Sequence, residues 1–135
     1  MVQRAPIHLY TDGASSGNPG KGGYGVVLVC GNLRKEFSDG FELTTNNRME
    51  LLAAITALEA LNESCHVTLY SDSQYLINGM TKNWAKNWKA NNWKNSQKKK
   101  LEHADIWEKI DSQMQDKEIT FKWINSADGS NKDTG

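Results

Sequence analysis

Three acidic residues in this chain stand where a predicted element begins or ends, namely Asp12, Glu50 and Asp72. Asp12 is the last residue of a predicted strand over residues 7–12, and a glycine-rich loop follows it. Asp72 follows a predicted strand over residues 66–71, and Glu50 lies near the start of a predicted helix over residues 45–61. Neighbouring parallel strands bring their carboxyl ends to one edge of a sheet, so we expect the three carboxylates to meet there.

Each acid also has a purely structural interpretation. Asp12 could belong to an Asp-Gly turn. Glu50 could be the third-position partner of an Asn47 helix cap, and Asp72 could cap the helix that begins at Ser73. Each interpretation is the simpler one when its residue is taken singly, but three acids at one edge favour a shared role.

Clustered carboxylates raise one another's pKa, and a hard divalent cation relieves their repulsion. Mg²⁺ accepts a few carboxylates together with waters and phosphate oxygens. Two such ions about 4 Å apart would activate an attacking water and stabilise a leaving oxygen during phosphodiester cleavage. The three acids therefore predict metal-dependent phosphodiester chemistry.

The hydrophobic pattern predicts an α/β fold that positions these acids. Strands over residues 7–12, 22–30 and 33–43 form a meander with a hairpin turn at Gly31-Asn32 and a bulge or bend at Asp39-Gly40. The helix over residues 45–61 should be largely buried. It is followed by a strand over 66–71, helices over 73–80 and 101–114 and a strand over 118–124. The second of these helices should turn Ile106, Trp107 and Ile110 inward. We expect residues 1–135 to form a single domain with a five-stranded mixed sheet, an antiparallel meander plus two parallel strands, flanked by helices.

Charge is unevenly distributed, although the formal net charge is zero. Residues 82–100 contain seven lysines and no acid, which leaves nine cations against sixteen acids elsewhere. This asymmetry predicts a polyanionic partner. In one helix, Lys82, Lys86 and Lys89 would share a face, with Trp84 and Trp88 opposite. We expect Trp84 and Trp107 in the core, while Trp88 and Trp93 either hold the shape of the segment or stack on a sugar–phosphate backbone.

Several classes of protein are disfavoured. No apolar run approaches the ~20 residues of a membrane span, so no membrane partner is expected. The first residues do not read as a signal peptide, which predicts a cytoplasmic location. Cys30 and Cys65 lack Cys-x-x-Cys spacing, so neither a zinc site nor a disulfide framework is expected.

Four stretches together resemble type 1 ribonuclease H, the bacterial kind, over about residues 6–124. They are Tyr10-Thr-Asp-Gly-Ala-Ser-Ser-Gly-Asn-Pro-Gly20, Thr44-Thr-Asn-Asn-Arg-Met-Glu-Leu51, Tyr70-Ser-Asp-Ser-Gln-Tyr75 and the Trp- and Lys-rich segment. The resemblance implies an RNase H-like fold and endonucleolytic cleavage of the RNA strand of RNA–DNA hybrids, leaving 5′-phosphate and 3′-hydroxyl ends. It implies two Mg²⁺ ions, which Mn²⁺ can replace, and we expect a monomer without an obligatory protein partner. Asp12, Glu50 and Asp72 match the first three metal-binding carboxylates, with Asp12 bridging both ions.

Substrate contacts are also implied by the resemblance. Asn18, Thr45 and Asn46 match residues that hold a DNA-strand phosphate, Asn47 and Gln74 match residues that reach the minor groove, and Ser15 lies beside a position that contacts the RNA backbone. Residues 82–100 resemble a basic protrusion, whose candidate contacts are Trp88, Trp93, Lys89, Lys94, Lys98 and Lys99. The alternative for Asn46-Asn47 is a plain helix cap.

The end of the chain departs from the family pattern. The family has a His-containing glycine-rich loop after its last strand, then a fourth Asp that opens a final helix. Here the histidines are His8, His66 and His103, and the final helix is expected to be absent. Asp128 and Asp133 are the candidates for the fourth ligand, and the sequence also allows neither. The alternative functions are a hybrid-binding module with weak or no catalysis and a nuclease or strand-transfer enzyme of the same fold that acts on DNA.

Overall fold

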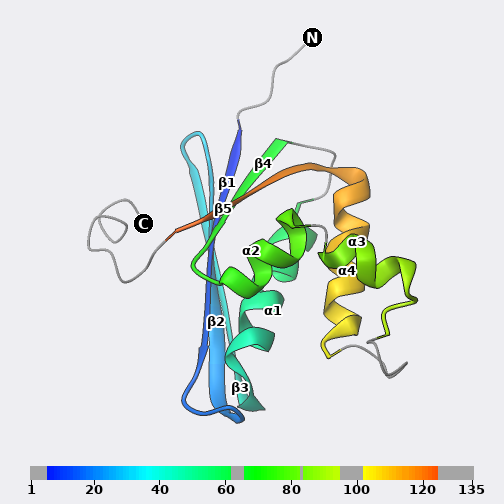
Figure 1. The fold of residues 1–135 in the computed structure, drawn as a ribbon. Coiled ribbons are helices and arrows are strands. Elements are labelled where there is room, and N and C mark those ends of the chain that lie inside the picture. The colour runs from blue at the N-terminus through cyan, green and yellow to red at the C-terminus, as the bar shows by residue number, and fades with distance from the viewer. Residues whose placement is uncertain (1–5, 62–65, 83, 95–101, 125–135) are drawn as a thin grey trace.

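The computed structural model describes residues 6–61, 66–82, 84–94 and 102–124. Its elements are β1 (Ile7–Ser15), β2 (Gly20–Cys30), β3 (Leu33–Thr44), α1 (Asn46–Glu59), β4 (His66–Ser71), α2 (Gln74–Thr81), α3 (Trp84–Ala90), α4 (Ala104–Asp116) and β5 (Glu118–Trp123) (Figure 1). The strand order is β3-β2-β1-β4-β5. The pairs β1–β2 and β2–β3 are antiparallel, whereas β1–β4 and β4–β5 are parallel, which confirms the predicted fold class.

The hydrophobic core lies between the sheet and the helices, which occupy one side of the sheet (Figure 1). Alternate residues of the central strands, such as Leu9 and Val26, point into this layer and are buried. Helix α1 packs across β1 and β2, and α4 packs against α1. The predicted inner face of α4 is confirmed, because Ile106, Trp107 and Ile110 are all buried. Among the described helices, none reaches the length and hydropathy of a transmembrane span.

The other face of the sheet carries a row of aromatic rings. The rings of Tyr10 and Tyr70 are stacked with centroids 4.7 Å apart, and His8 lies 5.9 Å from Tyr70. No helix from the described ranges covers this face (Figure 1).

Strand β1 is longer than predicted, and Asp12 is not its last residue. The strand continues to Ser15 and remains paired with β2 down to Ser15 and Gly22. The alternative of an Asp-Gly turn is wrong, since both residues pair with β2, and Gly13 is needed here because the first turn of α1 lies directly on it. A Cβ at Gly13 would be 2.5 Å from the carbonyl carbon of Met49.

The predicted bulge at Asp39-Gly40 is also misplaced. Gly40 pairs in register with Gly23, and the register shifts further on, between Gly20 and Gly22. The extra residue lies in β3 between Phe41 and Thr44, just before the chain enters α1.

Helix caps decide two of the structural alternatives. Thr45 caps α1 by accepting the N–H of Arg48 at 3.3 Å, and Ser73 caps α2 by accepting the N–H of Leu76 at 3.1 Å. The interpretations of Asn47 and Asp72 as helix caps are therefore wrong.

The predicted single helix carrying Lys82, Lys86 and Lys89 is wrong as well. Lys82 lies at the C-terminal end of α2, and only the other two lysines lie on α3. Trp107 is fully buried as expected, but Trp84 is 36% exposed and lies outside the core. Its position follows from the short α3, which turns Ala85 rather than Trp84 inward.

Candidate metal centre

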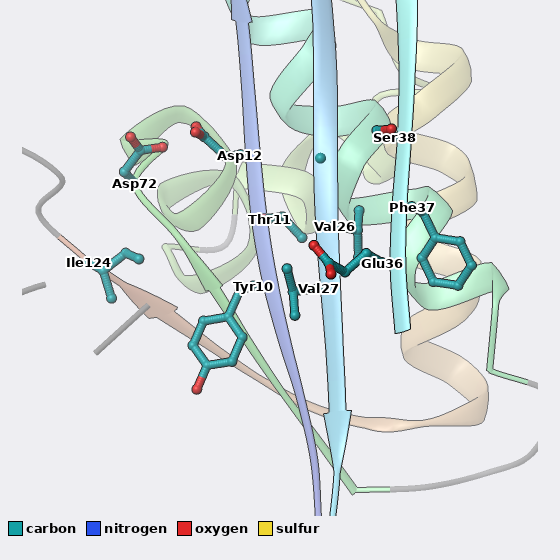
Figure 2. A pocket seen from close by; sticks show the side chains of 11 residues that line it. Tyr10, Thr11, Asp12, Val26, Val27, Glu36, Phe37, Ser38, Asp72 and Ile124 are labelled. Carbon is teal, nitrogen blue, oxygen red and sulfur yellow. The ribbon is translucent and has the colours of Figure 1, made fainter. Parts of the chain in front are cut away.

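Three carboxylates from separate elements converge at the carboxyl ends of β1 and β4. Asp12, Glu50 and Asp72 each offer an oxygen within 4.8 Å of the others. The parallel pairing of β1 with β4 ends at Thr11 and Ser71, and the residue that follows each of these is one of the two aspartates. Figure 2 shows the carboxylates of Asp12 and Asp72 turned toward one another.

Glu50 reaches the two aspartates because α1 approaches β1 closely. It is the fifth residue of the helix and only 7% exposed. Gly13 permits this approach, since its missing side chain leaves room for the backbone of Met49 and Glu50. The backbone N–H of Gly13 lowers the pKa of both Asp12 and Glu50 and so partly opposes the effect of burial.

Burial and mutual repulsion perturb the acids strongly. Desolvation raises the pKa of Glu50 to about 9, with further contributions from its hydrogen bond to Asp72 and from the charges of Asp72 and Asp12. Desolvation and the charge of Asp72 also raise the pKa of Asp12. Without a cation, the centre therefore retains a proton at neutral pH.

The donor set fits a hard divalent cation. The Oε1 atom of Glu50 is buried, and no group in the described part of the chain hydrogen-bonds it. A divalent cation would satisfy this oxygen and displace the retained proton. All three donors are carboxylate oxygens, which suits Mg²⁺ or Mn²⁺. The fourth-ligand candidates Asp128 and Asp133 lie outside the described residues.

Hydrogen bonds join the turn between β1 and β2 to the first residues of α1. The Oδ1 atom of Asn18 accepts the backbone N–H of Asn46 at 3.0 Å and the hydroxyl of Ser15 at 3.1 Å. The Oδ1 atom of Asn46 accepts the backbone N–H of Ser15 at 2.6 Å. Both amide oxygens are thus used within the protein, which leaves the amide NH₂ groups as donors for an external acceptor. Thr45 lies beside them and retains its hydroxyl proton as a donor.

Asn47 and Gln74 are exposed near the starts of α1 and α2. Both residues are close in sequence to a ligand of the centre. Asn47 lies one helical turn before Glu50, and Gln74 follows Asp72 by two residues. Their position agrees with a contact beside the carboxylates, although their role stays a prediction.

Some side chains of the basic segment, residues 82–100, contact other parts of the protein. Lys89 forms an ion pair with Asp111 of α4 at 3.0 Å. Trp88 packs on Trp107 with centroids 5.1 Å apart, and Trp93 packs against the core. These contacts favour the interpretation that the tryptophans hold the shape of the segment. Lys94 is exposed, and Lys98 and Lys99 lie outside the described residues.

Sequence reasoning missed two contacts that support the centre. Arg48 donates to Asp105 at 3.1 Å and lies 3.4 Å from the Nδ1 atom of His103, so it joins α1 to the start of α4. Trp123 donates its indole N–H to the backbone carbonyl of Asp72 at 3.2 Å. No local signal could have revealed them, because their partners are more than fifty residues away in the sequence.

A cavity of about 460 Å³ opens beside the centre on the face of the sheet that carries the aromatic rings. Tyr10, Val27 and Ile124 supply part of its wall, and Asp12 and Asp72 line one end (Figure 2). The two aspartates are therefore accessible from this face.

Comparisons with known proteins agree on one family. A sequence model of the RNase H family matches residues 4–134. The ribonuclease H of Rippkaea orientalis is 54% identical over 123 residues, which cover 91% of this chain and 76% of that protein. The ribonuclease H of Syntrophus aciditrophicus is 57% identical over 118 residues, which cover 87% of this chain and 68% of that protein.

Solved structures share the fold. LC9-RNase H1, described as a type 1 RNase H with the type 2 active-site motif, superposes with a TM-score of 0.82 at 24% identity, covering 96% of this chain and 67% of that one. LC11-RNase H1, solved in complex with an RNA/DNA hybrid, superposes with a TM-score of 0.67 at 25% identity, covering 95% of this chain and 91% of that one.

Proposed function

The chain belongs to the RNase H family, and from that premise we propose that it is an endonuclease that hydrolyses the RNA strand of RNA–DNA hybrids. The observation that carries this proposal is the convergence of Asp12, Glu50 and Asp72 within 4.8 Å. An RNase H of the same fold solved with an RNA/DNA hybrid supports the choice of substrate.

The three carboxylates would hold two divalent cations, with Mg²⁺ preferred and Mn²⁺ as a substitute. When bound, these cations supply the positive charge that activates water and stabilises the leaving 3′-oxygen, which leaves 5′-phosphate and 3′-hydroxyl ends. Asp12 and Asp72 are held in place by the end of the β1–β4 pairing, and Glu50 by the contact of α1 with Gly13. This rigid support keeps the ligand oxygens together before the substrate arrives.

The groups around the centre suit a hybrid. The resemblance to the family assigns Asn18, Thr45 and Asn46 to a phosphate of the DNA strand. The structure is consistent with this role, because their side-chain oxygens accept hydrogen bonds within the protein and their N–H and O–H groups remain as donors. Asn47 and Gln74 would meet the wide minor groove, where the 2′-hydroxyls identify the RNA strand. Contacts of this kind read the chemistry and shape of the strands rather than base sequence.

The basic segment would bind the hybrid by neutralising backbone phosphates. Exposed Lys94 is the described candidate, while Lys89 would first have to leave Asp111. Binding through several lysines should weaken steeply as salt is added.

Cleavage of labelled duplexes tests the proposal. An RNA–DNA hybrid, a DNA duplex and an RNA duplex of one sequence are incubated with the parent protein in Mg²⁺, in Mn²⁺ and in EDTA. We expect metal-dependent products from the RNA strand of the hybrid alone. Asp12→Asn should abolish them, and Asp39→Asn, which changes an exposed carboxylate on β3, should not.

Other results would point elsewhere. Salt-sensitive hybrid binding without products in either metal would identify a binding module that does not cut. Products from the DNA duplex, or undiminished cleavage by Asp12→Asn, would contradict the assigned substrate or the assigned centre.

A further inference from the structure

Helix α2 presents a row of polar side chains that begins beside the metal centre. Gln74, Asn78 and Lys82 are spaced four residues apart, so they follow one face of the helix over about 12 Å. With Ile77 and Trp123 they line a groove of about 210 Å³. This α2–Trp123 groove starts two residues after Asp72 and lies toward β5, which the strand order places on the opposite side of β1 from β2.

Trp123 forms the wall of the groove opposite α2. It is the last residue of β5, pairs with Ser71 and is 45% exposed. Its indole N–H donates to the carbonyl oxygen of Asp72, so the ring is held in a fixed orientation beside a carboxylate of the centre. Since its polar atom is used, the exposed part of the side chain offers an apolar ring surface to a ligand.

The polar wall of the groove has unused hydrogen-bonding capacity. Within the described ranges, the amides of Gln74 and Asn78 make no side-chain hydrogen bond, and no acid pairs with Lys82. An ammonium, two amides and an aromatic surface in one row match a phosphate, ribose hydroxyls and a sugar ring. The groove is too small to enclose a drug-sized ligand, but its open shape suits a strand that passes along it.

We propose that the α2–Trp123 groove binds a ribose–phosphate unit of the RNA strand next to the phosphate that is cut. The proposal rests on the proposed function and extends it with a second contact to the RNA strand. The RNA strand is assigned here because the groove begins at Asp72, whereas the groups assigned to the DNA strand lie at the start of α1. Lys82 contacts the phosphate, the amides meet ribose hydroxyls, and Trp123 packs on the sugar.

A simpler role exists for Lys82, because a cation at the C-terminal end of a helix is favourable in itself. The test therefore compares Lys82→Ala with Lys35→Ala, which removes an exposed lysine from β3. Hybrid binding is measured by fluorescence anisotropy in EDTA over a range of salt concentrations. We expect Lys82→Ala to weaken binding about fivefold and to reduce the log–log salt slope by about 0.9, and Lys35→Ala to do neither.

Trp123 is tested by two substitutions that separate its ring from its hydrogen bond. Trp123→Phe keeps an aromatic surface and should bind the hybrid within about twofold of the parent. Trp123→Leu removes that surface and should weaken binding fivefold or more. Equal losses in both variants would show that only the bond to Asp72 matters, which would overturn the ring's assigned contact.

A series of shortened RNA strands locates the contact. The DNA strand is kept whole while the RNA strand is shortened one nucleotide at a time from either end, and both anisotropy and cleavage at one labelled phosphate are followed. The effect of Lys82→Ala should vanish once the RNA no longer reaches the groove. An effect that is independent of RNA length, or a variant that matches Lys35→Ala, would overturn the proposal.

The two proposals fail in different ways. A parent protein that yields no metal-dependent product contradicts the proposed function, and the anisotropy series still decides whether the groove holds RNA. A parent that cuts hybrids while Lys82→Ala and Trp123→Leu behave like the parent contradicts the groove alone.

Discussion

Replacing Glu50 with Gln should stabilise the metal-free protein at neutral pH. The neutral amide has the shape of the protonated carboxyl group and can likewise donate a hydrogen bond to Asp72. Burial and the neighbouring aspartates raise the pKa of Glu50 from 4.5 to about 9. Between these values the folded chain holds a proton that the unfolded chain has released, so the parent protein loses stability as pH rises.

The size of the effect follows from this linkage. One proton held only by the folded state costs up to about 1.4 kcal/mol per pH unit, or at most about 2.7 kcal/mol between pH 5.5 and 7.5. Glu50→Gln removes this contribution, and the raised pKa of Asp12 acts on stability with the same sign in both proteins. The free energy of unfolding of a domain is typically about 5–15 kcal/mol, so a difference of this size is measurable.

Urea unfolding followed by circular dichroism in EDTA at both pH values measures this difference. Glu59→Gln is the matched control, because Glu59 is exposed on the same helix. The control should follow the parent, and Glu50→Gln should change less with pH. The reasoning is refuted when Glu50→Gln and the parent lose the same stability between the two pH values.

Metal binding gives a second measurement of the same proton. Because the cation needs the carboxylate form of Glu50, Mg²⁺ binding at pH 7.5 should release about one proton from the parent protein. Calorimetry in two buffers with different ionisation enthalpies counts that proton. Glu50→Gln should bind Mg²⁺ more weakly and release less, and an absence of proton release from the parent would contradict the assigned pKa.

Three further predictions concern packing, an ion pair and charge. Gly13→Ala should destabilise the protein by roughly 1–3 kcal/mol in urea unfolding and weaken Mg²⁺ binding, because its Cβ meets the backbone of α1; Gly40→Ala, with its nearest contact at 3.8 Å, should do neither. A double-mutant cycle on Arg48 and Asp105 should give a coupling below about 1 kcal/mol, since the side chains are 38% and 56% exposed. Lys94→Ala should reduce the salt slope of hybrid binding by about 0.9, and an unchanged slope would remove Lys94 from the interface.

Local patterns predicted most of the elements. The strand that contains Leu9, the hairpin turn at Gly31 and the inner face of α4 are set by residues close together in the sequence, and each was found where expected. The errors have local causes too. Asp-Gly is a common turn pair, so the sequence allows a turn glycine at Gly13, whereas in the structure Gly13 is the place where a helix lies on a strand.

For the candidate centre too, the sequence predicted some features and only the structure gives the others. The types of the three acids and their places at element boundaries came from the sequence, and with them the expectation of a metal. The sequence also predicted that the acids would meet, but it did not give their approach to within 4.8 Å, the identity of Glu50 as the acid whose pKa rises to about 9, or the exposed Trp123 beside Asp72.

The sequence by itself determined which residues could act and which elements would carry them, because hydrophobic periodicity and helix caps depend on neighbours a few positions apart. Only the tertiary structure decided the distances and the electrostatics. The three carboxylates lie together, partly shielded from water, only because α1 packs on Gly13 and β4 pairs with β1. Their repulsion and the raised pKa of Glu50 depend on both of these long-range contacts.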